Sequence, residues 1–151
     1  MSTKLKFSSN YHLDNVCEPV IPSRAYPSDI GLDLTLVRHV KDLNEKTAMY
    51  DSSISVLVPD GFYVEIVPRS SLSKYGYIMA NSVGIIDPSY RGTLRVVLTK
   101  VVDSAEPLTL PMTRFQLIIR KIHQFDVEVI DTDASSENTT DRGSGGFGST
   151  D

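Results

Sequence analysis

The chain has 151 residues, of which 40% are hydrophobic and 23% charged, and its formal net charge is −4. This length suits one domain with a substantial core, and the composition excludes wholesale disorder. No run approaches the ~20 apolar residues of a membrane-spanning helix, the N-terminus lacks the apolar run of a signal peptide, and the acidic balance argues against a nucleic-acid coat. Cys17 is the only cysteine, which excludes an intramolecular disulfide and fits a reducing cytosol or nucleus.

Eight prolines divide the chain into short pieces, most of which have the pattern of β strands. In residues 29–34 the two aspartates lie four apart, a spacing that in a strand puts Asp29 and Asp33 on one face, opposite Ile30, Leu32 and Leu34. Short helices are expected at residues 40–49 and 70–75. Strands are expected at residues 55–58 and 62–67, joined by a Pro59-Asp60-Gly61 turn, and at residues 93–99, 115–122 and 125–130. Many short strands with turns between them predict an all-β barrel or jelly roll.

The last 21 residues have a different composition. Residues 131–141 are polar and acidic and have the character of a linker. Four of the nine glycines then fall in RGSGGFGST, residues 142–150. A frayed tail is the ordinary interpretation of such an end. Glycine backbone, an arginine and hydroxyls are also donors for an anion, and Phe147 can stack on a base. This second interpretation predicts a nucleotide-binding arm.

Two further segments combine turn residues with groups that bind or activate a substrate. In PRSSL, residues 68–72, Arg69 and two serines suit phosphate oxygens, whereas the ordinary interpretation is a serine N-cap with a solvated arginine. In GIIDPSYRG, residues 84–92, Asp87 and Pro88 fit a hairpin turn. Asp87 also suits a general base, because a carboxylate is ionised at neutral pH and can deprotonate water. Tyr90 presents a flat face beside it.

The remaining polar candidates carry weaker signals. Asp29 and Asp33 fit either a solvated strand face or carboxylates beside a hydrated Mg²⁺, which binds phosphates and keeps several waters. His12, His39 and His123 are scattered and lack a metal-ligand spacing. Cys17 has no activating base nearby in the sequence and is not assigned as a nucleophile.

In order along the chain, these segments resemble the five motifs of the trimeric deoxyuridine triphosphatases (dUTPases). The resemblance spans nearly the whole chain, and five motifs in order are far more specific than any one of them. The matching segments are PSRA and DIGLDL (22–25 and 29–34), PRSSL (68–72), NSVGIIDPSYRG (81–92), RFQLI (114–118) and RGSGGFGST (142–150).

The resemblance implies hydrolysis of dUTP to dUMP and pyrophosphate, which limits uracil incorporation into DNA and supplies dUMP. It implies that Asp87 activates the attacking water, that Tyr90 packs on the deoxyribose, and that Asp33 contacts Mg²⁺ through a water. The substrate-binding residues implied by the resemblance are Arg69, Ser70, Ser71 and Gln116 for the phosphates, Asn81, Gly84, Ile85 and Ile86 for uracil, Tyr90 and Arg95, and Arg142, Phe147, Gly148, Ser149 and Thr150 of the arm.

The resemblance also implies a distorted jelly-roll homotrimer with an exchanged C-terminal arm. Residues 1–130 are then the β-barrel domain, residues 131–141 a flexible linker, and residues 142–151 a glycine-rich lid over the active site. Closure of such a lid excludes water and completes the site. The expected partners are dUTP, Mg²⁺ and two further copies of the chain, with no nucleic acid and no membrane.

Two features depart from the family pattern. The fourth motif reads PMTRFQ at residues 111–116, which places Arg114 one position closer to Gln116 than the common pattern does. Residues 37–53 are longer and more charged than a minimal member needs, and are expected as a surface excursion. The alternatives are a dCTP deaminase, which shares the fold and parts of these motifs, a dUTP-binding regulatory member, and a structural β-trimer without a ligand.

Overall fold

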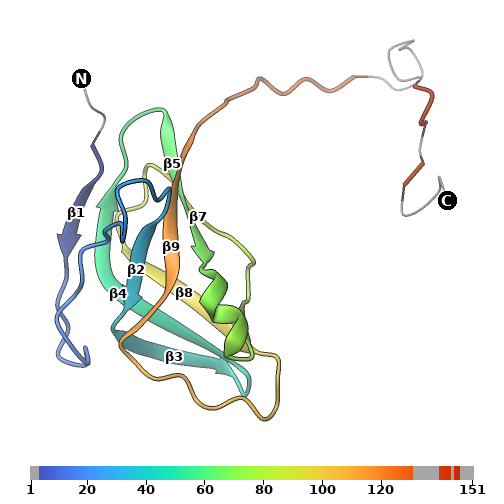
Figure 1. Ribbon diagram of the computed structural model, residues 1–151. Coiled ribbons are helices and arrows are strands. Elements are labelled where there is room, and N and C mark those ends of the chain that lie inside the picture. The colour runs from blue at the N-terminus through green and yellow to red at the C-terminus, as the bar shows by residue number, and fades with distance from the viewer. Residues whose placement is uncertain (1–3, 131–139, 144, 147–151) are drawn as a thin grey trace.

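Nearly all of the regular structure is antiparallel β-sheet (Figure 1). The computed structural model describes residues 4–130, 140–143, 145 and 146. Within these residues the elements are β1 (Lys6–Ser9), β2 (Leu32–Leu36), β3 (Arg38–Asn44), β4 (Thr47–Leu57), β5 (Phe62–Pro68), the 3-10 helix η1 (Ser70–Lys74), β6 (Tyr77–Met79), β7 (Gly84–Ile86), β8 (Thr93–Lys100) and β9 (Met112–Lys121). No helix among these residues is long and apolar enough to cross a membrane.

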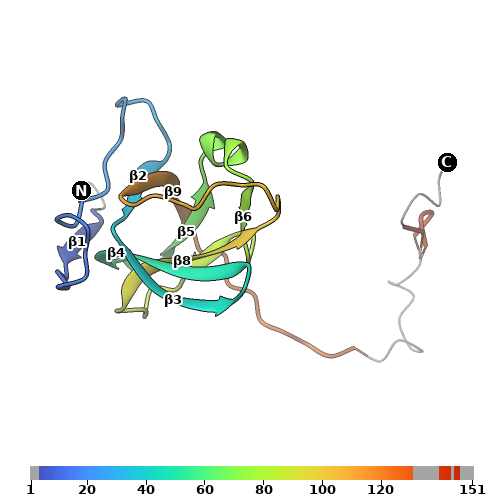
Figure 2. The same cartoon turned by 90° about the horizontal axis from the view of Figure 1, so that it is seen from below.

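The strands form two sheets that enclose one core. The first sheet has the order β1-β4-β8-β6, with β3 also paired to β4, and the second has the order β2-β9-β5-β7. Seen from below, the two sheets curve around a common centre, as in a barrel (Figure 2). The all-β barrel or jelly-roll prediction is therefore confirmed.

Alternating side chains of both sheets fill the core. Along β8, Leu94, Val96 and Leu98 are buried while Arg95 between them is exposed, which is the period-2 pattern of a strand with one buried face. The second sheet contributes its own inward-facing residues, and the side chains from both sheets form one cluster. Its fully buried members include Leu34, Leu36, Val64, Ile66, Leu94, Phe115 and Leu117.

The strands expected at residues 55–58, 62–67, 93–99 and 115–122 are present, as is the short helix after residue 70. The tight turn at residues 59–61 does not make a hairpin, however. β4 belongs to the first sheet and β5 to the second, so this turn carries the chain from one sheet to the other.

The helix expected at residues 40–49 is wrong, because β3 and the start of β4 form a hairpin there. Residues 47–51 of β4 also pair with β8. The strand therefore has a hydrogen-bonded neighbour along each edge, which a helix in this segment would not have. The surface excursion expected over residues 37–53 is correct only for β3, most of which is exposed. Asp51, Ser52 and Ser53 are completely buried.

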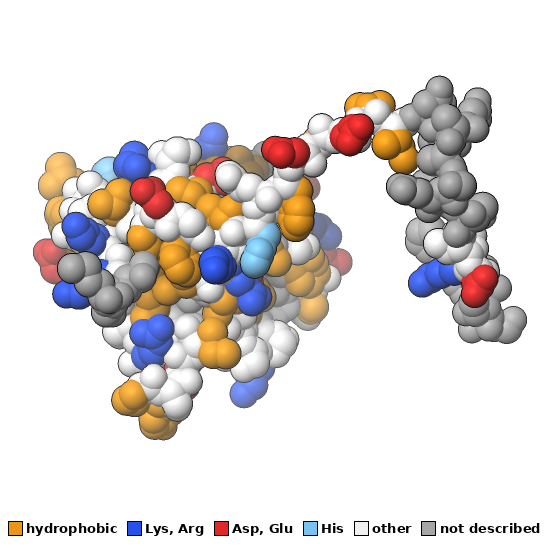
Figure 3. All heavy atoms as spheres, turned by 90° about the horizontal axis from the view of Figure 1, so that it is seen from above, with side chains coloured by type: hydrophobic (Ala, Val, Ile, Leu, Met, Phe, Trp, Pro, Cys, Tyr) orange, Lys and Arg blue, Asp and Glu red, His pale blue; other side chains and the backbone are white. Residues whose placement is uncertain are grey.

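The strand expected at residues 125–130 is also wrong. This segment leaves the end of β9 without joining either sheet (Figure 1). Phe125, Val127 and Val129 are 85%, 93% and 94% exposed, and Figure 3 shows hydrophobic and acidic side chains on the extended chain that leaves the body of the protein. Their alternation with Asp126 and Glu128 predicts a half-buried strand, but a strand also needs a neighbour, and this chain alone provides none among the described residues.

Candidate active site

Three of the expected phosphate and metal residues meet on the second sheet. Asp33 on β2 lies opposite Gln116 on β9, and Gln116 lies opposite Val67 at the end of β5, just before Arg69. An Nη1 of Arg69 donates to Oδ2 of Asp33 at 2.8 Å. These side chains line a cavity of about 560 Å³, so strand register brings together residues that are far apart in the sequence.

Close packing at this cavity requires a glycine. A Cβ atom added at Gly31 would overlap the side-chain amide of Gln116. Asp29 also lines the cavity, but it lies in the turn before β2 rather than on the strand. One of its carboxylate oxygens accepts the backbone N–H of Tyr26 at 2.9 Å. The expectation that Asp29 and Asp33 share one strand face is therefore wrong, although both reach the same cavity.

The PRSSL segment does not use its serines as an N-cap. Arg69 occupies the N-cap position of η1, and no side chain caps it. The hydroxyl of Ser71 is buried and has no hydrogen-bond partner among the described residues. An orphaned buried hydroxyl is costly unless something binds it. Ser70 lines a second cavity of about 470 Å³ together with Arg69 and Ser82.

The segment expected to bind the base begins beside that second cavity, which Ser82 lines. Asn81 is exposed in the turn between β6 and β7, and its carbonyl accepts the backbone N–H of Val83 at 2.6 Å. β7 then pairs with β5, with Gly84 opposite Ile66, Ile85 opposite Glu65 and Ile86 opposite Val64. A Cβ at Gly84 would press on the side chain of Ile66 at 3.3 Å. β7 belongs to the second sheet and β8 to the first, so the expected hairpin between them is not formed.

Asp87 and Tyr90 follow on a tight loop between β7 and β8. The backbone N–H of Tyr90 donates to the Asp87 carbonyl at 3.0 Å, and the Tyr90 hydroxyl donates to the Thr93 carbonyl at 2.9 Å. A Cβ at Gly92 would overlap the Tyr90 ring. The Asp87 side chain is exposed and accepts no hydrogen bond from any described residue. It is therefore available to water.

Asp87 is not among the residues of this chain that line the cavity at Asp33, Arg69 and Gln116. Asp87 follows Ile86, which lies opposite Val64 on β5, whereas Arg69 follows Pro68 at the end of the same strand. Four residues of strand span about 13 Å. The cavity at Asp33 and the loop at Asp87 are consequently separate features of the same protomer.

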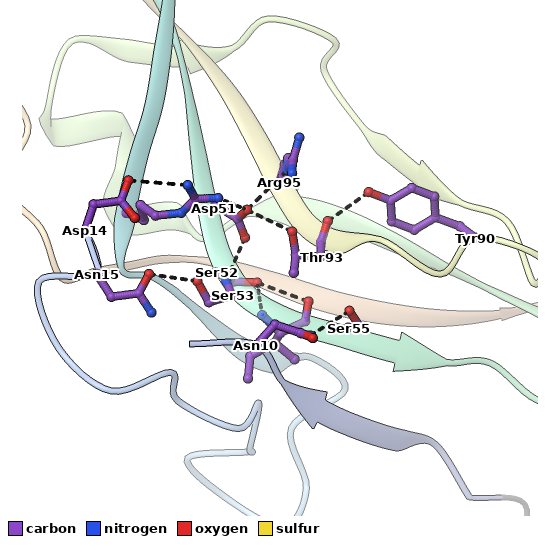
Figure 4. A network of polar contacts seen from close by, with 12 residues as sticks. Asn10, Asp14, Asn15, Asp51, Ser52, Ser53, Ser55, Tyr90, Thr93 and Arg95 are labelled. Atoms are coloured by element: carbon purple, nitrogen blue, oxygen red, sulfur yellow. Dashed lines mark hydrogen bonds and ion pairs between the residues drawn. The ribbon is translucent and has the colours of Figure 1, made fainter. Parts of the chain in front are cut away.

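Arg95 belongs to a buried polar network that the sequence did not reveal (Figure 4). Its Nε donates to Oδ2 of Asp51 at 3.2 Å, as do Nη2 of Arg38 at 2.9 Å and the hydroxyl of Thr93 at 2.8 Å. Burial favours the neutral acid and is the largest influence on the Asp51 pKa. The hydrogen bonds from Ser53 N–H, Thr93 and Arg38 outweigh it and lower the pKa. Asp51 lies within the surface excursion expected over residues 37–53, and nothing in the sequence indicates a buried carboxylate there.

Arg114 of the altered fourth motif is not among the residues that line the cavity at Asp33. It donates to the Tyr75 hydroxyl at 2.5 Å and lies 4.9 Å from the centre of that ring. Both residues line an open cavity of about 1050 Å³ between η1 and the loop before β9. Gln116 lies opposite Asp33 and lines the cavity there, whereas Arg114 is a partner of Tyr75.

Only part of the expected lid lies within the described residues. Residues 140–143 form a turn, in which the Gly143 N–H donates to the Thr140 carbonyl at 2.9 Å, and Nε of Arg142 donates to the Gly145 carbonyl at 2.9 Å. Phe147, Gly148, Ser149 and Thr150 lie outside the described residues, as does nearly all of the linker.

Known proteins resemble this chain over almost its full length. The sequence profile of the dUTPase family matches residues 18–151. The deoxyuridine 5'-triphosphate nucleotidohydrolase of Picosynechococcus is 33% identical over 132 residues, covering 87% of this chain and 90% of that protein. The enzyme of the same name from Solanum lycopersicum is 37% identical, covering 87% and 75%. The dUTPase of Staphylococcus bacteriophage 80alpha, solved with dUPNHPP, superposes with a TM-score of 0.73 at 18% identity and covers 98% of each chain.

Proposed function

This chain belongs to the dUTPase family and hydrolyses dUTP to dUMP and pyrophosphate, and we propose that it does so as a homotrimer whose sites are each assembled from neighbouring subunits. The separation of Asp87 from the Asp33–Arg69–Gln116 cavity carries this proposal. Each protomer holds one feature suited to activating water and another suited to binding phosphates. A closed ring of identical subunits can bring the first feature of one chain to the second feature of the next.

At such a site Asp87 takes a proton from the attacking water as it adds to the α-phosphorus, and pyrophosphate leaves. The exposed Asp87 carboxylate supports this role, because water reaches it without breaking a protein hydrogen bond. General-base catalysis contributes about 10²–10⁴-fold. The rest of the rate comes from positioning the triphosphate and neutralising its charge.

The phosphates bind at Arg69, Ser70, Ser71 and Gln116. The buried, unpartnered hydroxyl of Ser71 supports this assignment, because a phosphate oxygen is an acceptor it lacks in the free protein. Arg69 is already held by Asp33, which limits the rotamer freedom it loses on binding. Arg95 is a further candidate, since only its Nε contacts Asp51 and its side chain is 46% exposed.

The base and sugar lie against β7 and the loop that follows it. Backbone groups of Gly84, Ile85 and Ile86, together with Asn81, read the edge of uracil, and the Tyr90 ring packs against the deoxyribose. A site with fixed hydrogen-bonding groups rejects cytosine strongly, because a mismatched base leaves buried polar groups unpaired. The Tyr90 ring, lying against the 2′ carbon of the sugar, likewise leaves no room for a ribose 2′-hydroxyl.

The donor set near the phosphate cavity fits Mg²⁺. No group of three or more metal-ligating side chains occurs in the described part of the chain, but Mg²⁺ is ordinarily held by one or two carboxylates, waters and substrate phosphates. Asp33, acting through a water, and Asp29 beside it supply those carboxylates. When bound with the substrate, the ion neutralises triphosphate charge and orients the α-phosphate. We place the reaction in the cytoplasm or nucleus, which fits the single cysteine.

Residues 142–151 act as the lid, with residues 131–141 as the linker that gives it reach into a site on a neighbouring subunit. Arg142, Ser149 and Thr150 provide donors for the terminal phosphates, Phe147 an aromatic face for uracil, and Gly148 a backbone N–H that is unobstructed by a side chain. Closure then excludes water from the reacting phosphate.

Subunit mixing tests the shared site. Asp87→Asn and Gln116→Ala are each expected to inactivate every site in their own trimers. After the two variants are unfolded together and refolded in equal amounts, about a quarter of the shared sites contain both native residues, so activity returns. If both residues act within one chain, every site stays inactive and no activity returns.

Product analysis tests the reaction itself. The protein is incubated with Mg²⁺ and, separately, dUTP, dCTP, dTTP and UTP. Pyrophosphate and dUMP are expected from dUTP alone. Ammonia from dCTP would instead identify a deaminase, and binding of dUTP without any product would identify a regulatory protein.

A further inference from the structure

A completely buried carboxylate lies beneath the loop that carries Asp87 and Tyr90. Asp51 belongs to a break in the β4–β8 ladder, where β4 advances from Asp51 to Ser55 while β8 advances only from Arg95 to Thr93. Ser53 within this bulge has a φ of 56°, a left-handed conformation that costs energy for a residue other than glycine. Oδ1 of Asp51 accepts the Ser53 N–H at 2.7 Å and holds this bend in place.

The second oxygen of Asp51 holds Thr93. Oδ2 accepts the Thr93 hydroxyl at 2.8 Å and also faces the guanidinium groups of Arg38 and Arg95. Asp14 lies on the outer side of Arg38, 3.4 Å from its Nη1. Hydrogen bonds to an ionised acceptor are about twice as strong as those between neutral groups, so Thr93 is tied firmly to the buried sheet.

Thr93 connects this anchor to the substrate-binding loop. Its hydroxyl donates to Asp51, while its carbonyl accepts the Tyr90 hydroxyl at 2.9 Å. Figure 4 shows Thr93 between the two side chains. Gly92 lets the Tyr90 ring lie directly on the backbone. The ring therefore has one hydrogen bond to fix its tip, and the acceptor of that bond is positioned by Asp51.

We propose that Asp51 is a positioning residue for nucleotide selection, holding the Tyr90 ring through Thr93 so that the ring excludes a ribose 2′-hydroxyl. This inference rests on the proposed function of Tyr90. If Asp51 served only to stabilise the fold, its buried charge would need only to be neutralised, and Arg38 and Arg95 already do this. The positioning role follows from a further contact, because Oδ2 accepts the hydroxyl of Thr93, whose carbonyl accepts the Tyr90 hydroxyl.

The test compares two threonines on β8. Thr93→Val removes the hydroxyl that contacts Asp51 and keeps the side-chain shape. Thr99→Val is the matched control, because the Thr99 hydroxyl bonds Thr47 across the same two strands at 3.0 Å. The ratio of kcat/KM for dUTP to that for UTP is expected to fall about five- to tenfold in Thr93→Val, the effect of one hydrogen bond, and to stay unchanged in Thr99→Val. Thr93→Ser is expected to restore the ratio.

A spectroscopic readout separates this inference from the reaction. The seven tyrosines are replaced by fluorotyrosine, and Tyr90→Phe assigns the ¹⁹F resonance of Tyr90. That resonance is expected to shift in Thr93→Val and not in Thr99→Val, whether or not the protein hydrolyses dUTP. If the wild-type protein lacks dUTP hydrolysis but the resonance shifts, the positioning contact stands and the proposed function fails.

An unchanged Tyr90 resonance in Thr93→Val would overturn the inference, as would an equal loss of selectivity in both valine variants. Should Thr93→Val fail to fold, Asp51→Asn replaces it, since it keeps the shape and removes the charge. The same shift and the same loss of selectivity are then expected, and their absence has the same consequence.

Discussion

The cavity at Asp33 and the loop at Asp87 are held by different kinds of structure. Asp33 and Gln116 stand on paired strands, and β5 and β9 keep an unbroken register from Phe62–Lys121 to Pro68–Phe115. The Asp87 loop lies outside the strands and depends on Gly92, on two hydrogen bonds of Tyr90, and on the buried network at Asp51. We therefore expect the cavity to be sensitive to side-chain volume and the loop to loss of single polar groups.

The largest expected effect is at the loop. Asp87→Asn removes the proposed base while keeping the side-chain volume, so turnover of dUTP should fall about 10²–10⁴-fold, with nucleotide binding retained. Steady-state rates and equilibrium dialysis with dUTP measure the two quantities. Asp60→Asn is the control, because Asp60 is another exposed loop carboxylate and has no assigned role. Full activity in Asp87→Asn would refute the base assignment.

A smaller effect is expected when a side chain is enlarged at the cavity lined by Asp33 and Gln116. Gly31→Ala places a methyl group against the Gln116 amide, and a displacement of about 1 Å in a positioning group can cost on the order of 10²-fold in rate. The measurement is kcat/KM for dUTP. In the double variant Gly31→Ala with Gln116→Ala the overlap with the amide is gone and only a contact of 3.1 Å with Cβ of residue 116 remains, so Gly31→Ala should add little to the loss caused by Gln116→Ala alone. Additive losses would show that Gly31 acts in another way.

The cavity was the more predictable of the two regions because strand patterns and motif residues indicate it directly. Arg69, Gln116 and Asp33 come from segments whose alternation predicts strands, and register alone brings them together. The Asp51 network was not predicted, because residues 37–53 were expected as a surface excursion and a single acidic residue in such a segment gives no sign of burial. The strand wrongly predicted at residues 125–130 and the helix wrongly predicted at residues 40–49 have one cause. The local sequence pattern does not say whether the tertiary structure places a neighbouring strand beside the segment.

Loss of a contact in the buried Asp51 network should lower the free energy of unfolding. Arg38→Met removes one partner of Asp51, whereas Arg95, Thr93 and Ser53 N–H remain. The expected loss in free energy of unfolding is about 1–3 kcal/mol at neutral pH, the cost of leaving a buried polar group partly unsatisfied. Urea unfolding monitored by circular dichroism measures it. A loss below about 0.5 kcal/mol would mean that the remaining donors satisfy Asp51 completely.

The contact between Arg38 and Asp51 also predicts how the free energy of unfolding changes with pH. Because its partners lower the folded-state pKa of Asp51, the unfolded chain takes up a proton there before the folded chain does. The stabilisation is thus present above the ordinary carboxyl pKa of about 3.9 and is lost as pH falls from there through the folded-state value. The difference between wild type and Arg38→Met should therefore shrink in that acid range. A difference that grows would contradict the lowered pKa.

The smallest effect is expected at a solvent-exposed ion pair, which joins Lys46 in the turn between β3 and β4 to Asp103 after β8. Nζ of Lys46 lies 2.8 Å from Oδ1 of Asp103, closer than the Arg38–Asp51 contact, yet their side chains are 58% and 87% exposed. Water and salt screen such a pair, and ordering two mobile side chains offsets its attraction. Lys46→Ala should leave the urea midpoint unchanged, at low and at high salt, while Arg38→Met lowers it. Equal shifts in the two variants would show that burial does not decide the strength of these contacts, and that the Asp51 network holds its loop no more firmly than an ordinary surface pair.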